Sequence, residues 1–134
     1  MGATFGIRIE DIYVQFEDVL TAITNKTTII NTLPNDSQKC LIYSTISAID
    51  EETHINNLLE TSLGEHIIIY GKNSADTSVE KKYKQLKSLG FYKVYIYRGG
   101  MFEWILLQNI YGGDKIPTTV LEKDVLKYYS KKKT

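Results

Sequence analysis

The chain has 134 residues, of which 43% are apolar, and its 16 basic and 16 acidic residues cancel. This length suits one domain with a full hydrophobic core rather than two domains. The balanced charge excludes the strong field that draws proteins to nucleic acid or to anionic lipid. No apolar run approaches the roughly 20 residues of a membrane span. We therefore expect neither a membrane nor a specific nucleic acid among the partners.

Cysteine and histidine are too sparse to suggest redox or metal chemistry. The single cysteine, Cys40, has no partner for an internal disulfide, which is typical of a reducing compartment and predicts a cytoplasmic protein. His54 and His66 have no cysteines or clustered carboxylates around them at the spacing of metal ligands. The sequence therefore predicts no metal and no other cofactor.

Apolar and amphipathic segments alternate along the first half of the chain. Residues 6–10 predict a short opening strand or an extended arm. Helical spacing from Phe16 predicts a helix that ends at Asn25-Lys26. A β-branched strand over residues 27–31 and turn chemistry over residues 33–37 follow. Residues 40–46 predict another strand, and Asp50 is expected to cap a helix that Gly64 ends.

The second half of the chain alternates more clearly. Residues 67–70 predict a buried strand, residues 77–89 an amphipathic helix and residues 94–97 a further strand. A helix is expected after Gly100, with Phe102, Ile105 and Leu106 on one side. Residues 117–134 predict an appended helix with a Lys-rich tail. Such alternation predicts an α/β domain with a mostly parallel sheet of about five strands and helices on both faces.

The loop between the strand at 67–70 and the next helix is the most informative segment. A loop that joins a buried strand to a helix N-terminus gathers unpaired amides, so it is typical of an anion site or active site. Its reactive residue most often follows the strand directly, and here that position is glycine. The loop consists of Gly71, Lys72, Asn73, Ser74, Ala75 and Asp76.

The order of these pieces resembles the rhodanese-like domains. That family has an apolar strand, a six-residue active-site loop opening with cysteine, a helix, Gly-Phe, a strand, Gly-Gly and tryptophan. The matching pieces here are residues 67–70, 71–76 and 77–89, Gly90-Phe91, residues 94–97, Gly99-Gly100 and Trp104. The resemblance covers roughly residues 13–111. It implies a three-layer α/β/α domain over residues 1–116, with residues 117–134 as a helical extension.

The resemblance also implies what the family chemistry requires. A rhodanese carries sulfur as a persulfide on the loop cysteine, which needs a thiolate stabilised by loop amides and positive charge. Gly71 offers no nucleophile, and Asp76 stands where the family often has arginine. The family's strand-end aspartate corresponds to Asn31, and its arginine two residues on corresponds to Leu33. We therefore expect a catalytically inactive domain that acts as a protein-interaction or structural module.

Plainer structural roles and an enzymatic alternative remain open. Gly71 suits a tight loop or a positive φ, and Asp76 or Thr77 suits a helix N-cap. The alternative function is a sulfurtransferase-related enzyme that uses Cys40 as a displaced thiol or the loop amides for anion or thiol chemistry. As an isolated buried residue, Cys40 would instead act as a small apolar side chain.

An interaction role needs a surface. The helix predicted after Gly100 is rich in apolar residues, and any of them left outside the core would mark a partner site or a homodimer contact. The partner is an unspecified protein or a second copy of the chain. The candidate interface residues are Trp104, Leu107, Ile110 and Tyr111.

Overall fold

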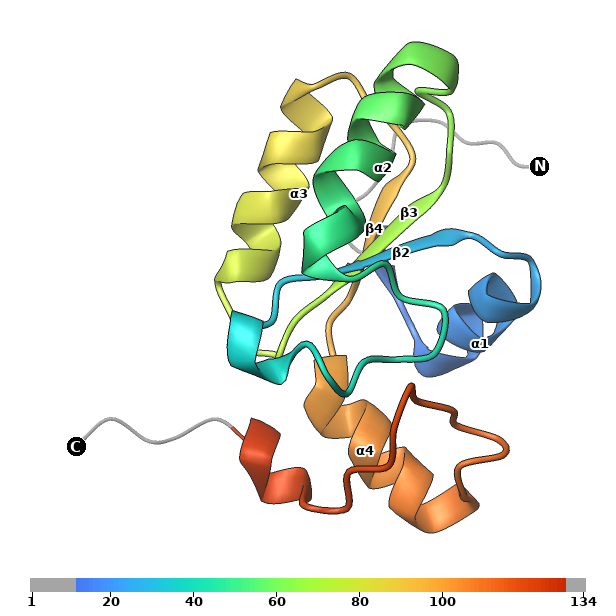
Figure 1. Ribbon diagram of the computed structural model, residues 1–134, viewed down its shortest axis with the longest axis vertical. Helices are drawn as coiled ribbons and strands as arrows, with labels where there is room; N and C mark the ends of the chain where they lie inside the picture. Colours follow the sequence, from blue (N-terminus) through green and yellow to red (C-terminus); the bar gives the residue numbers. More distant parts are fainter. Residues whose placement is uncertain (1–11, 130–134) are drawn as a thin grey trace.

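The computed structural model describes residues 12–129, which form a parallel sheet enclosed by helices (Figure 1). The strand order is β1-β4-β3-β2, and every neighbouring pair is parallel. The register sets Ile29 opposite Ile68 and Ile69 opposite Ile96, so β-branched side chains fill both faces of the central strands. The strands are β1 (Tyr13–Val14), β2 (Thr28–Asn31), β3 (Ile67–Tyr70) and β4 (Val94–Tyr97).

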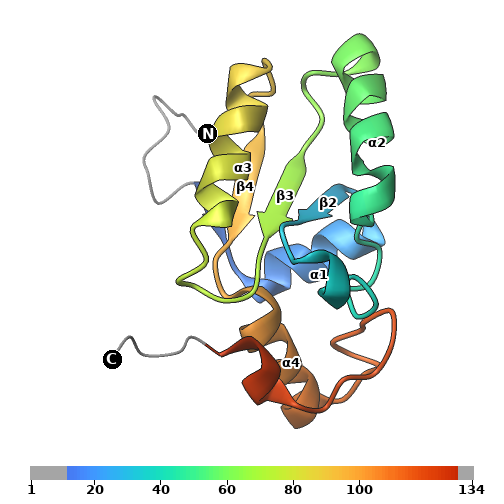
Figure 2. The same cartoon turned by 60° about the vertical axis from the view of Figure 1, so that its left-hand side comes forward.

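Helices lie on both faces of the sheet, as the predicted three-layer arrangement requires, and the last helix continues beyond the carboxyl ends of the strands (Figures 1 and 2). One core cluster joins α1 (Phe16–Thr24) and α4 (Gly100–Tyr111) to the sheet and includes the fully buried Trp104. The other joins α2 (Ala48–Thr61) and α3 (Ser78–Ser88). Because α2 and α3 each connect neighbouring parallel strands, they run in the same direction along the sheet.

The strand predicted over residues 40–46 is wrong: within residues 12–129 the sheet has four strands, and none of them includes residues 40–46. A turn closes here instead: the Thr45 amide donates to the Ile42 carbonyl at 3.0 Å, and Ser44 has a φ of 76°. Only isolated bridges remain, from Ile42 to Thr118 and from Ile46 to Ile30. The strand or arm predicted over residues 6–10 lies outside the described residues.

The ends of α2 also differ from expectation. The helix begins after Ser47, three residues before the predicted cap, and the Ser47 hydroxyl donates to the Asp50 carboxylate at 3.2 Å. It ends at Thr61, before Gly64, because Ser62 leaves the helical conformation with a φ of −162°. Asp50 therefore lies in the first turn, where its charge complements the helix dipole.

The described part of the C-terminal segment, residues 117–129, packs against the domain core and does not form the helix predicted over residues 117–134. Residues 117–124 are irregular, and up to residue 129 only the 3-10 helix η3 (Val125–Tyr128) follows. The Trp104 indole donates to the Pro117 carbonyl at 2.9 Å, the Thr119 amide donates to the Leu41 carbonyl, and Tyr128 is buried. These long-range contacts hold the backbone of the segment in an extended form. No helix within residues 12–129 is long and apolar enough to cross a membrane.

Candidate functional site

A pocket of about 660 Å³ lies at the carboxyl ends of β2 and β3, beside the loop over residues 71–76. Parallel strands bring their carboxyl ends together at one edge of the sheet, which is where α/β proteins bind ligands. Four of the six predicted loop residues line it: Lys72, Asn73, Ala75 and Asp76. Gly71 is buried beneath them, and Ser74 is exposed outside the lining.

The Asp76 carboxylate is turned inward, across the loop. Its Oδ2 accepts the Lys72 amide at 2.9 Å, while its Oδ1 accepts the Ser78 amide at 3.0 Å and the Ser78 hydroxyl at 2.5 Å. Amides at both ends of the loop are thus satisfied by a charge that belongs to the loop itself. Asp76, and not Thr77, supplies the expected capping interaction at the start of α3.

Position 71 requires glycine because neighbouring side chains leave no room for a Cβ atom, and not because of its backbone conformation. Its φ lies outside the left-handed region, where Gly90, Gly100 and Gly112 fall. A Cβ at position 71 would collide with Asp76 Oδ2, and it would lie 2.7 Å from Val79 Cγ2 and 2.8 Å from Thr32 Oγ1. The inward carboxylate and the missing side chain at position 71 are therefore two parts of one arrangement.

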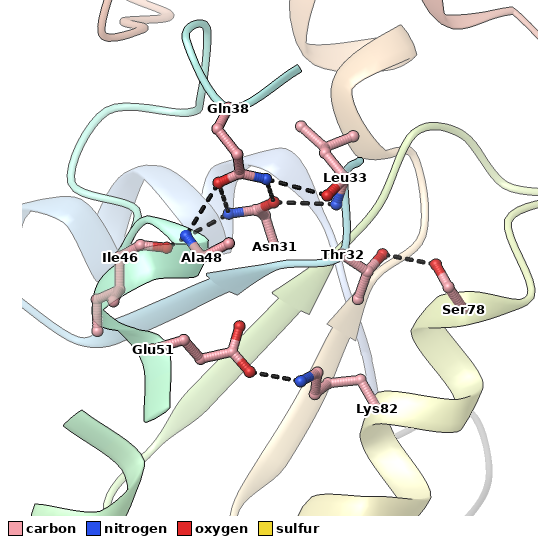
Figure 3. A network of polar contacts seen from close by, with 9 residues as sticks. All are labelled: Asn31, Thr32, Leu33, Gln38, Ile46, Ala48, Glu51, Ser78 and Lys82. Atoms are coloured by element: carbon pink, nitrogen blue, oxygen red, sulfur yellow. Dashed lines mark hydrogen bonds and ion pairs between the residues drawn. The ribbon is translucent and has the colours of Figure 1, made fainter. Parts of the chain in front are cut away.

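The loop backbone is fixed from three directions. Its Gly71 and Lys72 carbonyls accept the Met101 and Phe102 amides of α4 at 3.0 and 2.9 Å. The Asn73 side-chain amide donates to a carbonyl of η3 at 2.8 Å. Just after β2, the Thr32 and Ser78 hydroxyls share a hydrogen bond of 2.8 Å (Figure 3). Such anchoring holds the loop through contacts within the chain itself.

Asn31 and Leu33, which the resemblance placed in the active-site environment, do not line the pocket. The Asn31 amide is buried and pairs with the Gln38 amide: Asn31 Oδ1 accepts from Gln38 Nε2 at 2.7 Å, and Asn31 Nδ2 donates to Gln38 Oε1 at 3.2 Å (Figure 3). The Leu33 side chain belongs to the apolar core. Both residues stabilise the turn after β2.

Cys40 lies apart from the loop pocket. It borders a separate hollow of about 140 Å³, is 4% exposed, and its thiol donates to the Val120 carbonyl at 3.4 Å. Burial raises the pKa of this thiol above its usual value. The geometry therefore keeps Cys40 protonated and poorly accessible.

The predicted interface on α4 is only partly available. Trp104 is fully buried and forms part of the core, so it cannot belong to an exposed surface. Leu107 is half-buried against the same core. Ile110 and Tyr111 are 65% and 55% exposed. The buried face of α4 carries Met101, Trp104, Ile105 and Gln108, and so differs from the expected Phe102, Ile105 and Leu106.

Sequence reasoning missed several lining residues, including Thr32, Ser78 and Tyr129. Thr32 directly follows β2, so the pairing of β2 with β3 in a parallel sheet would have placed it beside Gly71. Ser78 is the first residue of α3, where a hydroxyl often meets the preceding loop. Nothing in the sequence connects Tyr129 to a loop more than 50 residues away.

The histidines make structural contacts. His54 Nε2 shares a hydrogen bond of 3.1 Å with the Thr28 hydroxyl, and His66 packs edge-on against Tyr95. Among residues 12–129, no three His, Cys, Asp or Glu side chains gather closely enough to hold a metal ion.

Together, the all-parallel sheet, the helices on both faces and the pocket-forming loop after β3 define an α/β protein with a strand-end site. The family model for the rhodanese-like domain matches residues 18–107, well over half of the chain. The chain belongs to the rhodanese-like domain family.

Solved structures agree with this fold. A full-length protein from Lactobacillus plantarum is 23% identical with a TM-score of 0.58, the match covering 74% of this chain and 85% of that one. The BH2092 protein from Bacillus halodurans is 20% identical with a TM-score of 0.59, covering 72% of each chain. The Alr3790 protein from Anabaena is 16% identical with a TM-score of 0.56, covering 87% and 100%. No curated protein sequence matches the chain.

Proposed function

We propose that this rhodanese-like domain is catalytically inactive and serves as a protein-interaction or structural module. The loop over residues 71–76 corresponds to the active-site loop of the family, and Gly71 stands where the persulfide-forming cysteine would be. The observation that carries the proposal is the inward carboxylate of Asp76, bonded to the Lys72 amide and packed over Gly71.

This carboxylate opposes sulfur transfer in two ways. A persulfide, like thiosulfate, is an anion that needs free amide donors and positive charge around it. Asp76 already occupies the Lys72 and Ser78 amides and adds a negative charge at the same place. Anion chemistry through the loop amides would first have to displace this carboxylate.

Cys40 does not offer a substitute nucleophile. Sulfur transfer requires a thiolate that the substrate can reach. Burial both shields the Cys40 thiol and raises its pKa, and the thiol faces a different hollow from the loop pocket.

An interaction role is supported by the concentration of exposed apolar side chains at one end of the molecule. Scattered apolar residues are ordinary on protein surfaces, whereas a concentration of them is typical of contact sites. Those on α4 and the C-terminal segment are Leu106, Ile110, Tyr111, Val120, Leu121, Leu126 and Tyr129.

The direct test is a thiosulfate:cyanide sulfurtransferase assay on the whole chain. We expect no turnover above the uncatalysed rate, either for the natural sequence or for Cys40→Ser. Turnover that disappears in Cys40→Ser would overturn the proposal in favour of a displaced-thiol enzyme.

A second test asks whether the loop retains the family geometry. The pair of changes Gly71→Cys and Asp76→Arg removes the carboxylate and restores thiol and positive charge together. We expect the thiolate of this variant to take the outer sulfur of thiosulfate, forming a persulfide and releasing sulfite, faster than free cysteine does. The matched control is Gly71→Cys alone, in which Asp76 opposes the thiolate. If the double variant reacts no faster than free cysteine, the loop no longer forms an anion cradle.

The interaction role is tested with the exposed end of α4. The changes Ile110→Glu and Tyr111→Ser should abolish retention of a co-purifying partner, whereas Lys123→Ser, a polar surface change nearby, should not. Equal retention by all variants would exclude this surface as the contact site.

A further inference from the structure

Helices α2 and α3 lie side by side on one face of the molecule (Figures 1 and 2). The exposed side chains of the two helices carry charges of opposite sign. Both pack over the same core cluster and run in the same direction. α2 has four carboxylates and neither lysine nor arginine, whereas α3 has four lysines and one glutamate. The face is therefore an acidic stripe beside a basic one.

Little of this charge is neutralised within the chain. Lys82 pairs with Glu51 at 2.5 Å across the groove between the helices (Figure 3), and within residues 12–129 this is the only ion pair that either helix makes. Glu52 and Glu60 on α2, and Lys81 and Lys84 on α3, are exposed. Two stripes of opposite sign thus face solvent.

The groove between the stripes is suited to contact. It has a volume of about 490 Å³ and a floor that includes the buried side chains of Ile55 and Leu86. Leu89 lines it at the end of α3 with 43% exposure. Near the start of α2, Ile49 is 90% exposed, which leaves a large apolar side chain in water.

We infer that this face binds a second copy of the chain. A two-fold axis that runs along the groove, parallel to the helices, sets α2 of each copy over α3 of the other. Every acidic stripe then meets a basic one, as an isologous interface requires. A uniformly anionic partner such as nucleic acid or lipid would be attracted by α3 and repelled by α2, so self-association fits the pattern best.

The inferred dimer is a separate conclusion from the proposed lack of catalysis at the loop, and neither conclusion depends on the other. The loop is at the carboxyl edge of the sheet, whereas the dimer face is the outer surface of the α2 and α3 layer. Sedimentation tests the dimer, and sulfur transfer tests the loop.

Charge reversal on one helix at a time gives the sharpest test, measured by sedimentation velocity. One variant carries Glu52→Lys and Glu60→Lys, and the other carries Lys81→Glu and Lys84→Glu. Each alone places like charges across the axis, so we expect its self-association to weaken by about tenfold or more. An equimolar mixture should form a heterodimer, because the remaining stripes are complementary. A variant with all four changes should again dimerise.

Matched controls separate the geometry from net charge. Lys115→Glu with Lys123→Glu makes the same change in net charge as the reversal on α3 but away from the face, and this variant should dimerise like the natural chain. Raising the salt concentration from about 0.05 to 0.5 M should weaken the natural dimer, because it shortens the screening length.

Three results would overturn the inference. One is a natural chain that stays monomeric at about 100 μM, a concentration at which a micromolar dimer is formed. Another is the failure of the two folded charge variants to associate when mixed. A third is a control variant that dissociates as much as the reversals on α2 or α3. The first result depends on no variant and stands even if a reversed chain fails to fold.

Discussion

Replacing Gly71 by alanine tests whether the Asp76 carboxylate and position 71 are coupled. The added Cβ would collide with Asp76 Oδ2 and lie 2.7 Å from Val79 Cγ2 and 2.8 Å from Thr32 Oγ1. All three are side-chain atoms, but Asp76 is held by the Lys72 and Ser78 amides and Val79 is buried in the core. Relief of the collision therefore requires the carboxylate to leave the Lys72 amide.

The cost follows from these contacts. Overpacking a closely fitted site lowers the free energy of unfolding by about 1–3 kcal/mol, and loss of a hydrogen bond to a charged acceptor lowers it by about 1.5 kcal/mol more. We expect Gly71→Ala to lower the free energy of unfolding by about 3 kcal/mol. In an Asp76→Ala background neither the collision with the carboxylate nor its hydrogen bond to Lys72 exists, so the same change should cost about 1.5 kcal/mol less.

Urea unfolding followed by circular dichroism measures both values, and Gly113→Ala is the matched control. A Cβ at position 113 would lie 3.5 Å from Leu121 Cδ2, an ordinary contact, so this change should be neutral or stabilising by about 0.5 kcal/mol. The reasoning is refuted if Gly71→Ala is as stable as the natural chain. It is also refuted if the cost is unchanged by Asp76→Ala.

Three further predictions concern the core. Burial raises the pKa of Tyr70 and Tyr97 above the ordinary value of 10.0, with hydrogen bonds lowering the Tyr70 pKa and Glu103 raising the Tyr97 pKa further. The stability that each of these protonated, buried tyrosines contributes is fully present below pH 10. Above pH 10 the free energy of unfolding falls by about 1.4 kcal/mol per pH unit for each tyrosine, because the phenols lose their protons first in the unfolded chain. A free energy of unfolding that stays flat across pH 9–11 would contradict this. Asn31→Asp replaces an amide that donates to Gln38 and to the Ile46 carbonyl with a buried carboxylate. The free energy of unfolding should therefore fall by about 3 kcal/mol at pH 7, and by less at pH 4, where the carboxylate gains a proton. Equal losses at both pH values would exclude a charge effect. Trp104→Phe removes the bond to the Pro117 carbonyl and should cost about 2 kcal/mol and expose the C-terminal segment to proteolysis, whereas the exposed control Tyr111→Phe should change neither.

Much of the fold could be predicted from the sequence because its strands and helices carry strong local patterns. β3 and β4 lie at the predicted residues, and α1 begins at the predicted Phe16. Their apolar runs are short, β-branched and bounded by polar loops, so local preference and tertiary context agree. The strand predicted at residues 40–46 failed for the opposite reason. Its apolar side chains are buried as expected, but the tyrosine hydroxyl of Tyr70 accepts the Ile42 amide, and the backbone turns instead of pairing.

The candidate site was predictable in place but not in detail. The order of strand, loop and helix located residues 71–76 correctly at the edge of the sheet. It did not show that Asp76 turns inward, nor that Asn31 faces Gln38 instead of the pocket. Side-chain direction depends on which donors lie within reach once the backbone has folded, and these are Lys72 and Ser78 for Asp76 and Gln38 for Asn31.

The sequence by itself determined the class of fold, the position of the loop after β3 and the absence of a cysteine at residue 71. Those properties reside in local periodicity and residue identity. Only the tertiary structure decided why position 71 is glycine, that Trp104 is core and not interface, and that the C-terminal segment is part of the domain. Each of these depends on contacts that form only in the folded chain: those of Asp76, Val79 and Thr32 around Gly71, and that of Trp104 with Pro117. Long-range contacts of this kind overrode local helix preference in residues 117–129, because burying Tyr128 and pairing the backbone stabilise the irregular form.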